Sequence, residues 1–251
     1  TAARLESYPQ EVAARITGKP AFGNEVRNFR AEDIYVGYRY FETFAKDDVL
    51  FPFGYGLTYT QFAIVCETAA VCGDAVNFVF RVKNTGKERG KEVVQLYFSA
   101  PQGRLGKPAR VLCGFKKTKE LQPGNTQKIE ISVPFYTLAS YDDTGAAGAE
   151  NGENTAYCYV AEAGKYAFYA GENVRDAEKC FSFRMDKLRI ISRCSQCLAP
   201  VFPFEKMATT DGKTYFFEPA TLQKSPVRIE RSAAAEAPVT GNRGIKLKDV
   251  E

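Results

Sequence analysis

The middle of the chain alternates between hydrophobic and polar positions with a period of two. Val76, Phe78, Phe80 and Val82 share one face of an extended segment. This period is typical of a strand that buries one face in a core. The same alternation, or short β-branched and aromatic runs, predicts further strands at 62–66, 93–98, 111–115, 128–133, 157–160, 165–169 and 181–183.

Turn-forming residues separate the predicted strands. Asn84-Thr85-Gly86 closes one strand, and Leu121-Gln122-Pro123-Gly124 leads into another. Gly, Pro and Asn favour turns because they supply or tolerate the backbone angles that turns need. Residues 161–164 lie between two predicted strands, so we expect 157–160 and 165–169 to pair as a hairpin.

Short strands at regular spacing predict a mainly β protein. The fold class is a fibronectin type III/immunoglobulin-like antiparallel β-sandwich over residues 58–185. The pattern of two Cys and one Trp found in true immunoglobulin domains cannot be met, because the chain has no Trp. We expect residues 186–251 to be an irregular connector.

The segments outside the sandwich have weaker patterns. Residues 34–41 are β-branched and aromatic, which predicts a strand or extended segment. Residues 50–57 carry Pro and two Gly among aromatics, which favours a packed loop between domains over a ligand site. Beyond Lys187 the alternation fades. We expect 198–204 to be extended because Pro interrupts it, and 225–239 has a linker composition.

Composition and charge exclude several functions. The chain contains no His, which removes Ser-His-Asp and Cys-His nucleophile activation and His-ligated metals. The net charge of +4 arises from 34 basic and 30 acidic residues without one basic patch, so we expect no nucleic-acid partner. No stretch approaches the about 18–20 apolar residues of a membrane span, so we expect no membrane partner. Thr1 resembles a cut end rather than a biological start.

The seven Cys are scattered and odd in number, which fits reduced thiols and weakly favours a cytoplasmic location. Cys194 and Cys197 form a single CxxC. Zinc usually needs a second pair or His ligands, and a thioredoxin-like site needs a βαβ context. Neither accompanies this pair, so we interpret the two thiols as incidental.

A loop at 142–154 collects Asp142, Asp143, Glu150 and Glu153, which raises the alternative of a calcium site. The loop lacks the alternating oxygen ligands of an EF-hand. A solvated hairpin end is the simpler interpretation. We therefore assign no metal-binding, cofactor-binding or catalytic residue and expect no cofactor.

Several motifs in order resemble glycoside hydrolase family 3. IYVGYRYF at 34–41 and VLFPFGYGLTYTQF at 49–62 resemble the end of that family's α/β-sandwich domain. The resemblance implies that residues 1–57 are the C-terminal remnant of an α/β domain. The following landmarks resemble the family's fibronectin type III-like domain: VKNTG at 82–86, GKEVVQLY at 90–97, KPAR at 107–110, LQPG at 121–124 and LASYD at 138–142. One departure is Asp33, where the family commonly has Gly; Gly would permit a backbone shape that Asp tolerates less well.

The resemblance continues towards the C-terminus. APVFPFEKM at 199–207 and GNRGIKLKDV at 241–250 resemble the connector of a subgroup with reversed domain order, in which the catalytic barrel comes last. We therefore expect a barrel and an α/β-sandwich domain of the same polypeptide as partners.

The resemblance implies that the parent enzyme is a retaining β-glucosidase-like hydrolase acting through two carboxyl groups. The family's nucleophilic Asp lies in the barrel in a Ser-Asp-Trp context, with a Lys-His substrate clamp, and this chain has neither Trp nor His. The acid/base Glu lies upstream of the segment present here and cannot be matched to Glu6, Glu11, Glu25 or Glu32. This fragment alone is expected to be inactive, and the substrate sugar is not defined by its sequence.

Three hypotheses follow. In the first, the chain is a structural module in which Tyr38, Phe51, Phe53 and Tyr55 fix the sandwich to its neighbour through buried ring area. In the second, the chain is a carbohydrate-binding module, which requires a row of solvent-facing aromatics on one sheet face, for example among Tyr97, Tyr157, Tyr159 and Tyr169. A third and weaker idea, an adhesion-type sandwich, lacks the repeats it would need.

Overall fold

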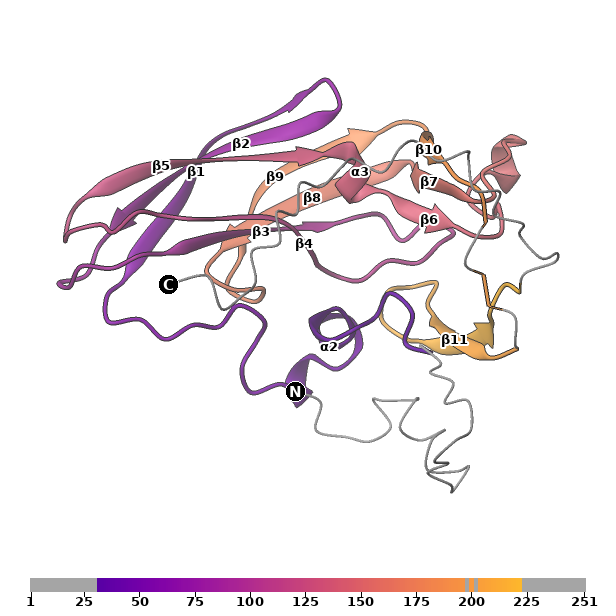
Figure 1. The fold of residues 1–251 in the computed structure, drawn as a ribbon, viewed down its shortest axis with the longest axis horizontal. Helices are drawn as coiled ribbons and strands as arrows, with labels where there is room; N and C mark the ends of the chain where they lie inside the picture. Colours follow the sequence, from indigo (N-terminus) through magenta and orange to yellow (C-terminus); the bar gives the residue numbers. More distant parts are fainter. Residues whose placement is uncertain (1–30, 197–198, 201–202, 223–251) are drawn as a thin grey trace, which may run out of the picture.

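Two packed antiparallel sheets form the centre of the molecule (Figure 1). The computed structural model describes residues 31–196, 199–200 and 203–222. One sheet has the order β1-β2-β5 and the other β4-β3-β8-β9, which confirms the predicted mainly β, fibronectin type III-like fold. Their strands are β1 (Phe62–Cys72), β2 (Ala75–Asn84), β3 (Val93–Ser99), β4 (Val111–Lys117), β5 (Thr126–Pro134), β8 (Gly164–Gly171) and β9 (Glu178–Met185).

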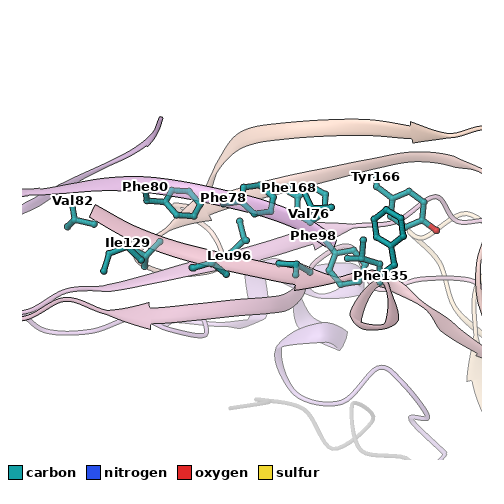
Figure 2. Packing of buried hydrophobic residues seen from close by; sticks show 14 of the residues in the cluster. Val76, Phe78, Phe80, Val82, Leu96, Phe98, Ile129, Phe135, Tyr166 and Phe168 are labelled. Carbon is teal, nitrogen blue, oxygen red and sulfur yellow. The ribbon is translucent and has the colours of Figure 1, made fainter. Parts of the chain in front are cut away.

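The core lies between these sheets, as the alternation predicts (Figure 2). Val76, Phe78, Phe80 and Val82 of β2 are buried in this core together with Phe168 of β8. Phe78 and Phe168 have ring centroids 5.0 Å apart. Full burial of such a side chain stabilises a fold by about 1.5–3 kcal/mol, so this ring cluster is a principal source of the sandwich's stability.

A third sheet, in the order β6-β7-β10, extends one end of the sandwich. It contains β6 (Ser140–Asp142), β7 (Cys158–Ala161) and β10 (Arg189–Arg193), and the short helices α3 (Phe135–Leu138) and η3 (Ala149–Asn151) lie nearby in the chain. The predicted hairpin between 157–160 and 165–169 is wrong. Both edges of β8 are occupied, by β3 and β9, so β7 pairs with β6 and β10 instead. The pairing of β10 with β7 also corrects the expectation that the sheet pattern fades beyond Lys187.

The predicted strand at 34–41 is also wrong, because this region contains α2 (Tyr38–Phe44), followed by η2 (Lys46–Asp48). Gly37 has φ 59°, a left-handed conformation that turns the chain immediately before the helix. Tyr40, Phe41 and Phe44 then fall at helical spacing and pack in one cluster. The aromatic composition that resembled a strand is the buried face of a short helix.

A hairpin that the pattern did not predict follows the third sheet. It consists of β11 (Glu205–Ala208) and β12 (Phe216–Pro219). Met207 is buried against Tyr35, Tyr40 and Phe41, and its amide donates a hydrogen bond to the carbonyl of Ala31 at 2.7 Å. The segments before and after the sandwich therefore pack together. Within the described ranges, no helix has the length and apolar character needed to cross a membrane.

Candidate functional site: the junction between helix α2 and the sandwich

The outer face of the four-stranded sheet is covered rather than exposed to water. Leu96 and Phe98 of β3 point into the core, while Tyr97 between them is fully buried on the other face. Tyr38 of α2 covers Tyr97, with ring centroids 6.3 Å apart, and Phe53 stacks on Tyr38 at 4.3 Å. This coverage explains why the sequence of β3 is hydrophobic at successive positions instead of alternating.

Hydrogen bonds fix the positions of the tyrosines at this contact. The Tyr38 hydroxyl accepts a bond from the backbone amide of Leu112 in β4 at 2.8 Å. The Tyr97 hydroxyl donates to Gln95 Oε1 at 2.5 Å, and burial raises the pKa of Tyr97 so that it remains a neutral donor. Gln95 Nε2 donates to the carbonyls of Glu172 and Gly54. A Cβ at Gly54, where φ is 85°, would lie 2.2 Å from Gln95 Oε1, so this close approach requires glycine.

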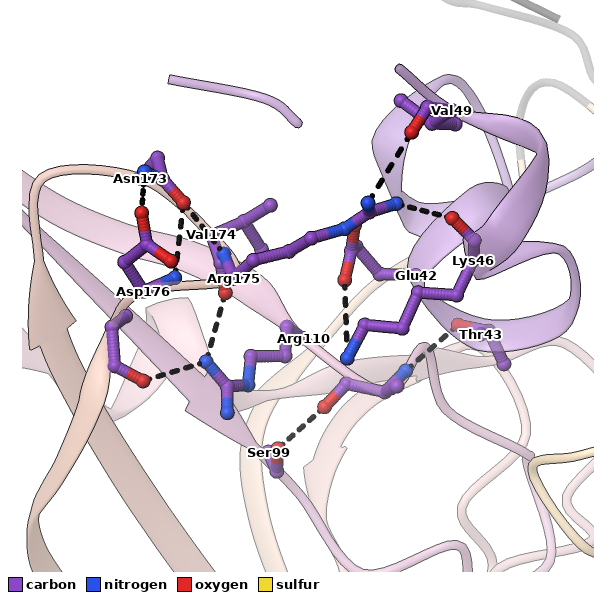
Figure 3. A network of polar contacts seen from close by, with 12 residues as sticks. Glu42, Thr43, Lys46, Val49, Ser99, Arg110, Asn173, Val174, Arg175 and Asp176 are labelled. Carbon is purple, nitrogen blue, oxygen red and sulfur yellow. Dashed lines mark hydrogen bonds and ion pairs between the residues drawn. The ribbon is translucent and has the colours of Figure 1, made fainter. Parts of the chain in front are cut away.

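An ion pair joins α2 to the loop between β8 and β9 (Figure 3). Arg175 Nε lies 3.0 Å from Glu42 Oε1, and the Glu42 side chain is only 3% exposed. The Arg175 guanidinium also donates to the carbonyls of Val49, at 3.3 Å, and Lys46. The Arg175 side chain, which belongs to the sandwich, therefore binds α2, η2 and the residue that follows η2.

A second set of polar contacts connects α2 to the segment that enters β4 (Figure 3). The Thr43 hydroxyl accepts a hydrogen bond from the amide of Ala109 at 2.9 Å, and Ser99 Oγ donates to the Ala109 carbonyl at 2.5 Å. Arg110 donates to the carbonyls of Val174 and Ala177 at 2.8 and 3.0 Å. The Arg110 guanidinium lies 3.8 Å from the centre of the Tyr169 ring, a cation–π contact.

A buried ion pair shapes the loop at 101–108 that leads to this segment. Lys107 Nζ lies 2.5 Å from Glu162 Oε2, and both side chains are almost fully buried. Glu162 Oε1 accepts the amide of Arg104 at 2.7 Å. Burial lowers the pKa of Lys107, and the adjacent Glu162 carboxylate opposes that shift. Removing one partner of such a pair would leave an uncompensated buried charge, so each residue depends on the other.

The C-terminal hairpin is attached through Lys206 of β11. Its Nζ lies 3.3 Å from Asp143, 3.6 Å from Asp33 and 3.9 Å from Glu218. Asp33 has φ 48°, a left-handed conformation. The position where the sequence departs from the usual Gly is therefore one where the backbone favours Gly.

The acidic loop at 142–154 joins the antiparallel strands β6 and β7, and residues 149–154 are exposed, as the interpretation of a solvated hairpin end predicts, but the start of the loop is buried. Asp142 is fully buried, and its carboxylate accepts hydrogen bonds from the amides of Gly145, Ala146 and Ala147 and from the Thr155 hydroxyl. Burial alone would raise the pKa of Asp142, but these hydrogen bonds lower it below its usual value. Among the described residues, no group of three or more acids or cysteines could hold a metal ion.

The predicted aromatic residues occupy different environments. Tyr38 and Phe53 pack at the junction, but Phe51 and Tyr55 are 67% and 50% exposed, with rings 5.1 Å apart. Their expected part in fixing the sandwich is not realised in the described residues.

Tyr97 and Tyr169 do not form the row of solvent-facing aromatics that a carbohydrate-binding module would require, because Tyr97 is buried and Arg110 covers Tyr169. Instead, Tyr159 contacts Tyr136 and Tyr141, with ring centroids 5.0 and 5.3 Å apart.

Sequence reasoning missed Glu42, Thr43 and Arg175. The spacing of Tyr38 and Glu42, one helical turn apart, could have revealed a shared contact face only if α2 had been predicted as a helix. Cys194 is unpaired and exposed, and Cys197, the second residue of the CxxC, lies outside the described residues.

The chemistry open to this junction is limited because its buried carboxyl groups already have partners. The buried acids Glu42 and Glu162 are paired with Arg175 and Lys107, and buried Asp142 is bound by backbone amides. A general acid or nucleophile must be able to reach a substrate, and these carboxyl groups are enclosed by their own partners. The junction is suited to fixing two parts of a protein in one orientation.

The fold and this junction define a fibronectin type III-like module attached to a preceding helical segment. The model of the fibronectin type III-like domain matches residues 92–174.

Known β-glucosidases contain regions similar to nearly the whole chain. It is 47% identical over 246 residues to a β-glucosidase of Ruminococcus albus, covering 96% of this chain and 25% of that protein. It is 40% identical over 238 residues to β-glucosidase A of Butyrivibrio fibrisolvens, covering 88% of this chain and 27% of the relative. The crystal structure of a β-glucosidase from Paenibacillus barengoltzii aligns with a TM-score of 0.79 at 41% identity, covering 99% of this chain and 27% of that one.

The chain is therefore homologous to one portion of these larger β-glucosidases. It spans about a quarter of the length of the curated relatives that it matches.

Proposed function

We propose that this chain is the accessory, non-catalytic portion of a family 3 glycoside hydrolase of the β-glucosidase type. The observation that carries the proposal is the saturated junction, in which Tyr38, Glu42 and Thr43 of α2 each have a partner on the sandwich. The similarity to a quarter of each β-glucosidase supports the same proposal. In the parent protein the module holds the domain preceding it at a fixed angle.

The proposed parts are an α/β-domain remnant at 1–57, the fibronectin type III-like domain at 58–185 and a connector at 186–251 that leads to a catalytic barrel. The partners are that barrel and the α/β-sandwich domain of the same polypeptide. The parent acts on β-linked glycosides by the retaining, two-carboxylate mechanism. Support for the reversed domain order comes from the segment at 199–207, which continues past the sandwich.

The purified 251-residue chain is predicted not to hydrolyse aryl β-glucosides, because its buried acids Glu42, Asp142 and Glu162 are each engaged by structural partners. The measurement is release of the coloured aglycone over hours, with a β-glucosidase as the positive control. Turnover that copurifies with the folded chain and saturates with substrate would refute the proposal. Turnover that is lost on a further purification step would identify a contaminant and leave the chain inactive as predicted.

A carbohydrate-binding module is the second candidate, favoured by the cluster of Tyr136, Tyr141 and Tyr159. Tyr136 and Tyr141 are 54% and 39% exposed, so their rings could stack on sugars. However, the rings are inclined at 47° and 56° to that of Tyr159, so they do not form one flat platform. Retention of the chain on insoluble β-glucans that is lost in Tyr136→Ala would support this candidate, and absence of retention would eliminate it.

A further inference from the structure

Two cysteines from opposite sheets meet at one open edge of the sandwich. Strand β1 is the edge strand of the three-stranded sheet, and β9 is the edge strand of the four-stranded sheet. Cys66 of β1 and Cys180 of β9 both pack against the central core, and both line the groove between the two edges. Strands β1 and β9 are in contact at this edge, and each thiol donates to a carbonyl beside the groove, Cys66 to Thr68 at 3.5 Å and Cys180 to Phe168 at 3.6 Å.

Both cysteines lie at irregularities in their strands. The pairing of β1 with β2 shifts between Cys66 and Thr68. The pairing of β9 with β8 shifts between Phe181 and Lys179, so Cys180 is the extra residue of that bulge. A β-bulge re-aims a side chain and leaves the strand locally less constrained. The backbone at both positions therefore has freedom to adjust the approach of one sulfur to the other.

We propose that Cys66 and Cys180 are the site of a reversible disulfide that links the two sheets of the sandwich. In the structure both thiols are free. The oxidant is a low-molecular-weight disulfide such as oxidised glutathione. One protein thiolate attacks it and releases one small thiol, and the second protein thiolate attacks the resulting mixed disulfide and releases the other. One S–S bond forms in the protein, one is lost from the oxidant, and the two protein protons end on the released thiols.

The environment determines how the exchange depends on pH. Burial raises the pKa of Cys66 above its usual value and that of Cys180 to about 12. Because only the thiolate attacks, the rate of crosslinking rises as the pH is increased towards these pKa values. The charged groups that face the groove are Glu172, Asp176, Glu178 and Lys179. These mainly acidic neighbours further disfavour the negatively charged thiolate form of either cysteine.

The crosslink constrains the unfolded chain, because the loop it closes includes most of the sandwich. Oxidised protein is therefore expected to melt at a higher temperature than reduced protein, by several degrees. Cys72 lies on the same strand, is exposed and provides a matched control.

The experiment treats the 251-residue chain with oxidised glutathione and then alkylates the remaining thiols for peptide mapping. The expected result is one peptide pair joined through Cys66 and Cys180, reversed by dithiothreitol, with a raised melting temperature. Cys72→Ser should retain both effects, and Cys66→Ala and Cys180→Ala should each lose them. Only mixed disulfides with glutathione, or a crosslink through any other cysteine, would overturn the proposal. If Cys66→Ala does not fold, mapping the unsubstituted chain decides the question alone.

Discussion

Asp33 and Asp142 are two acidic residues whose surroundings give them opposite characters. Asp33 is held in a left-handed backbone conformation with its carboxylate near Lys206, whereas Asp142 is enclosed by amides that point at its oxygens. The backbone of Asp33 is strained, whereas the Asp142 carboxylate fixes the conformation of its loop. Each situation predicts a distinct response to substitution.

Asp33→Gly is expected to increase the free energy of unfolding by up to about 1 kcal/mol. Gly adopts φ 48° without the steric cost that a Cβ incurs, and Lys206 keeps Asp143 and Glu218 as partners. Urea unfolding of both proteins measures the difference. Asp33→Asn removes the charge but keeps a Cβ, so it separates the backbone effect from the electrostatic effect. A Gly variant less stable than the parent chain contradicts this account.

Asp142→Ala is expected to lower the free energy of unfolding by about 2–4 kcal/mol, because buried donors on three amides and Thr155 lose their acceptor. The pKa of Asp142 is lower in the folded state than its usual 3.8. Its contribution is therefore complete above about pH 4 and is lost as the pH falls through the folded-state pKa.

Acid unfolding of the Asp142→Asn variant tests the sign of this effect. Below about pH 4 its stability should depend less steeply on pH than that of the unsubstituted chain. Asp143→Asn is the matched control, since Asp143 is partly exposed and forms an ion pair with Lys206, which keeps Asp33 and Glu218 as partners. An unchanged pH slope in Asp142→Asn would mean that another carboxylate controls acid unfolding.

At the scale of elements, the pattern of side chains was sufficient to predict the strands of the two main sheets and β7, but not β6, β10, the β11–β12 hairpin or all of the strand partners. The four core residues of β2 face inward as the period of two requires, so β2 could be located from its sequence. The partner of β7 could not, because pairing depends on which edges of β8 are already occupied. Helix α2 was misread because Tyr and Phe serve a helical contact face as readily as a strand.

The contacts at the junction could be predicted from the sequence only in part, for a related reason. Tyr38 and Phe53 were identifiable as aromatic anchors, and they do pack together. The ion pair of Glu42 with Arg175 joins residues 133 positions apart, and no local pattern specifies such a contact. Asp142 was recognisable as part of an acidic loop, but the amides that bury it became visible only in the folded chain.

The Glu42–Arg175 ion pair is expected to be the main polar bond between α2 and the sandwich. Arg175→Ala should lower the free energy of unfolding by about 2–4 kcal/mol, because it leaves the Glu42 carboxylate buried without its partner. Lys46→Ala is the control, since Lys46 is 58% exposed and lies 3.8 Å from the same carboxylate. Its loss should cost less than about 1 kcal/mol.

A double-mutant cycle with Glu42→Ala measures the coupling between the two residues. The double variant should be less destabilised than the sum of the two single variants, because removing both charges leaves neither one buried alone. Strict additivity, or equal effects of Arg175→Ala and Lys46→Ala, would show that the pair does not hold the helix.

At the scale of the whole molecule, the segments before and after the sandwich converge on one side of it. Helix α2 lies against the four-stranded sheet, and the β11–β12 hairpin packs on the residues preceding that helix through Met207 (Figure 1). A protein that must keep neighbouring domains aligned needs the segments that leave the sandwich to be held in fixed positions. The proposed function therefore requires that the sandwich hold α2 rigidly.

Amide hydrogen exchange in α2 tests that claim most directly. A helix of seven residues without a side-chain cap is not stable alone, so any protection must come from docking. The amides of Phe41 and Ala45, which bond to Gly37 and Phe41, should exchange about as slowly as those of β3. Their protection should fall in Arg175→Ala while that of β3 persists. Fast exchange of α2 in the unsubstituted chain, or no change in Arg175→Ala, would contradict a rigid junction.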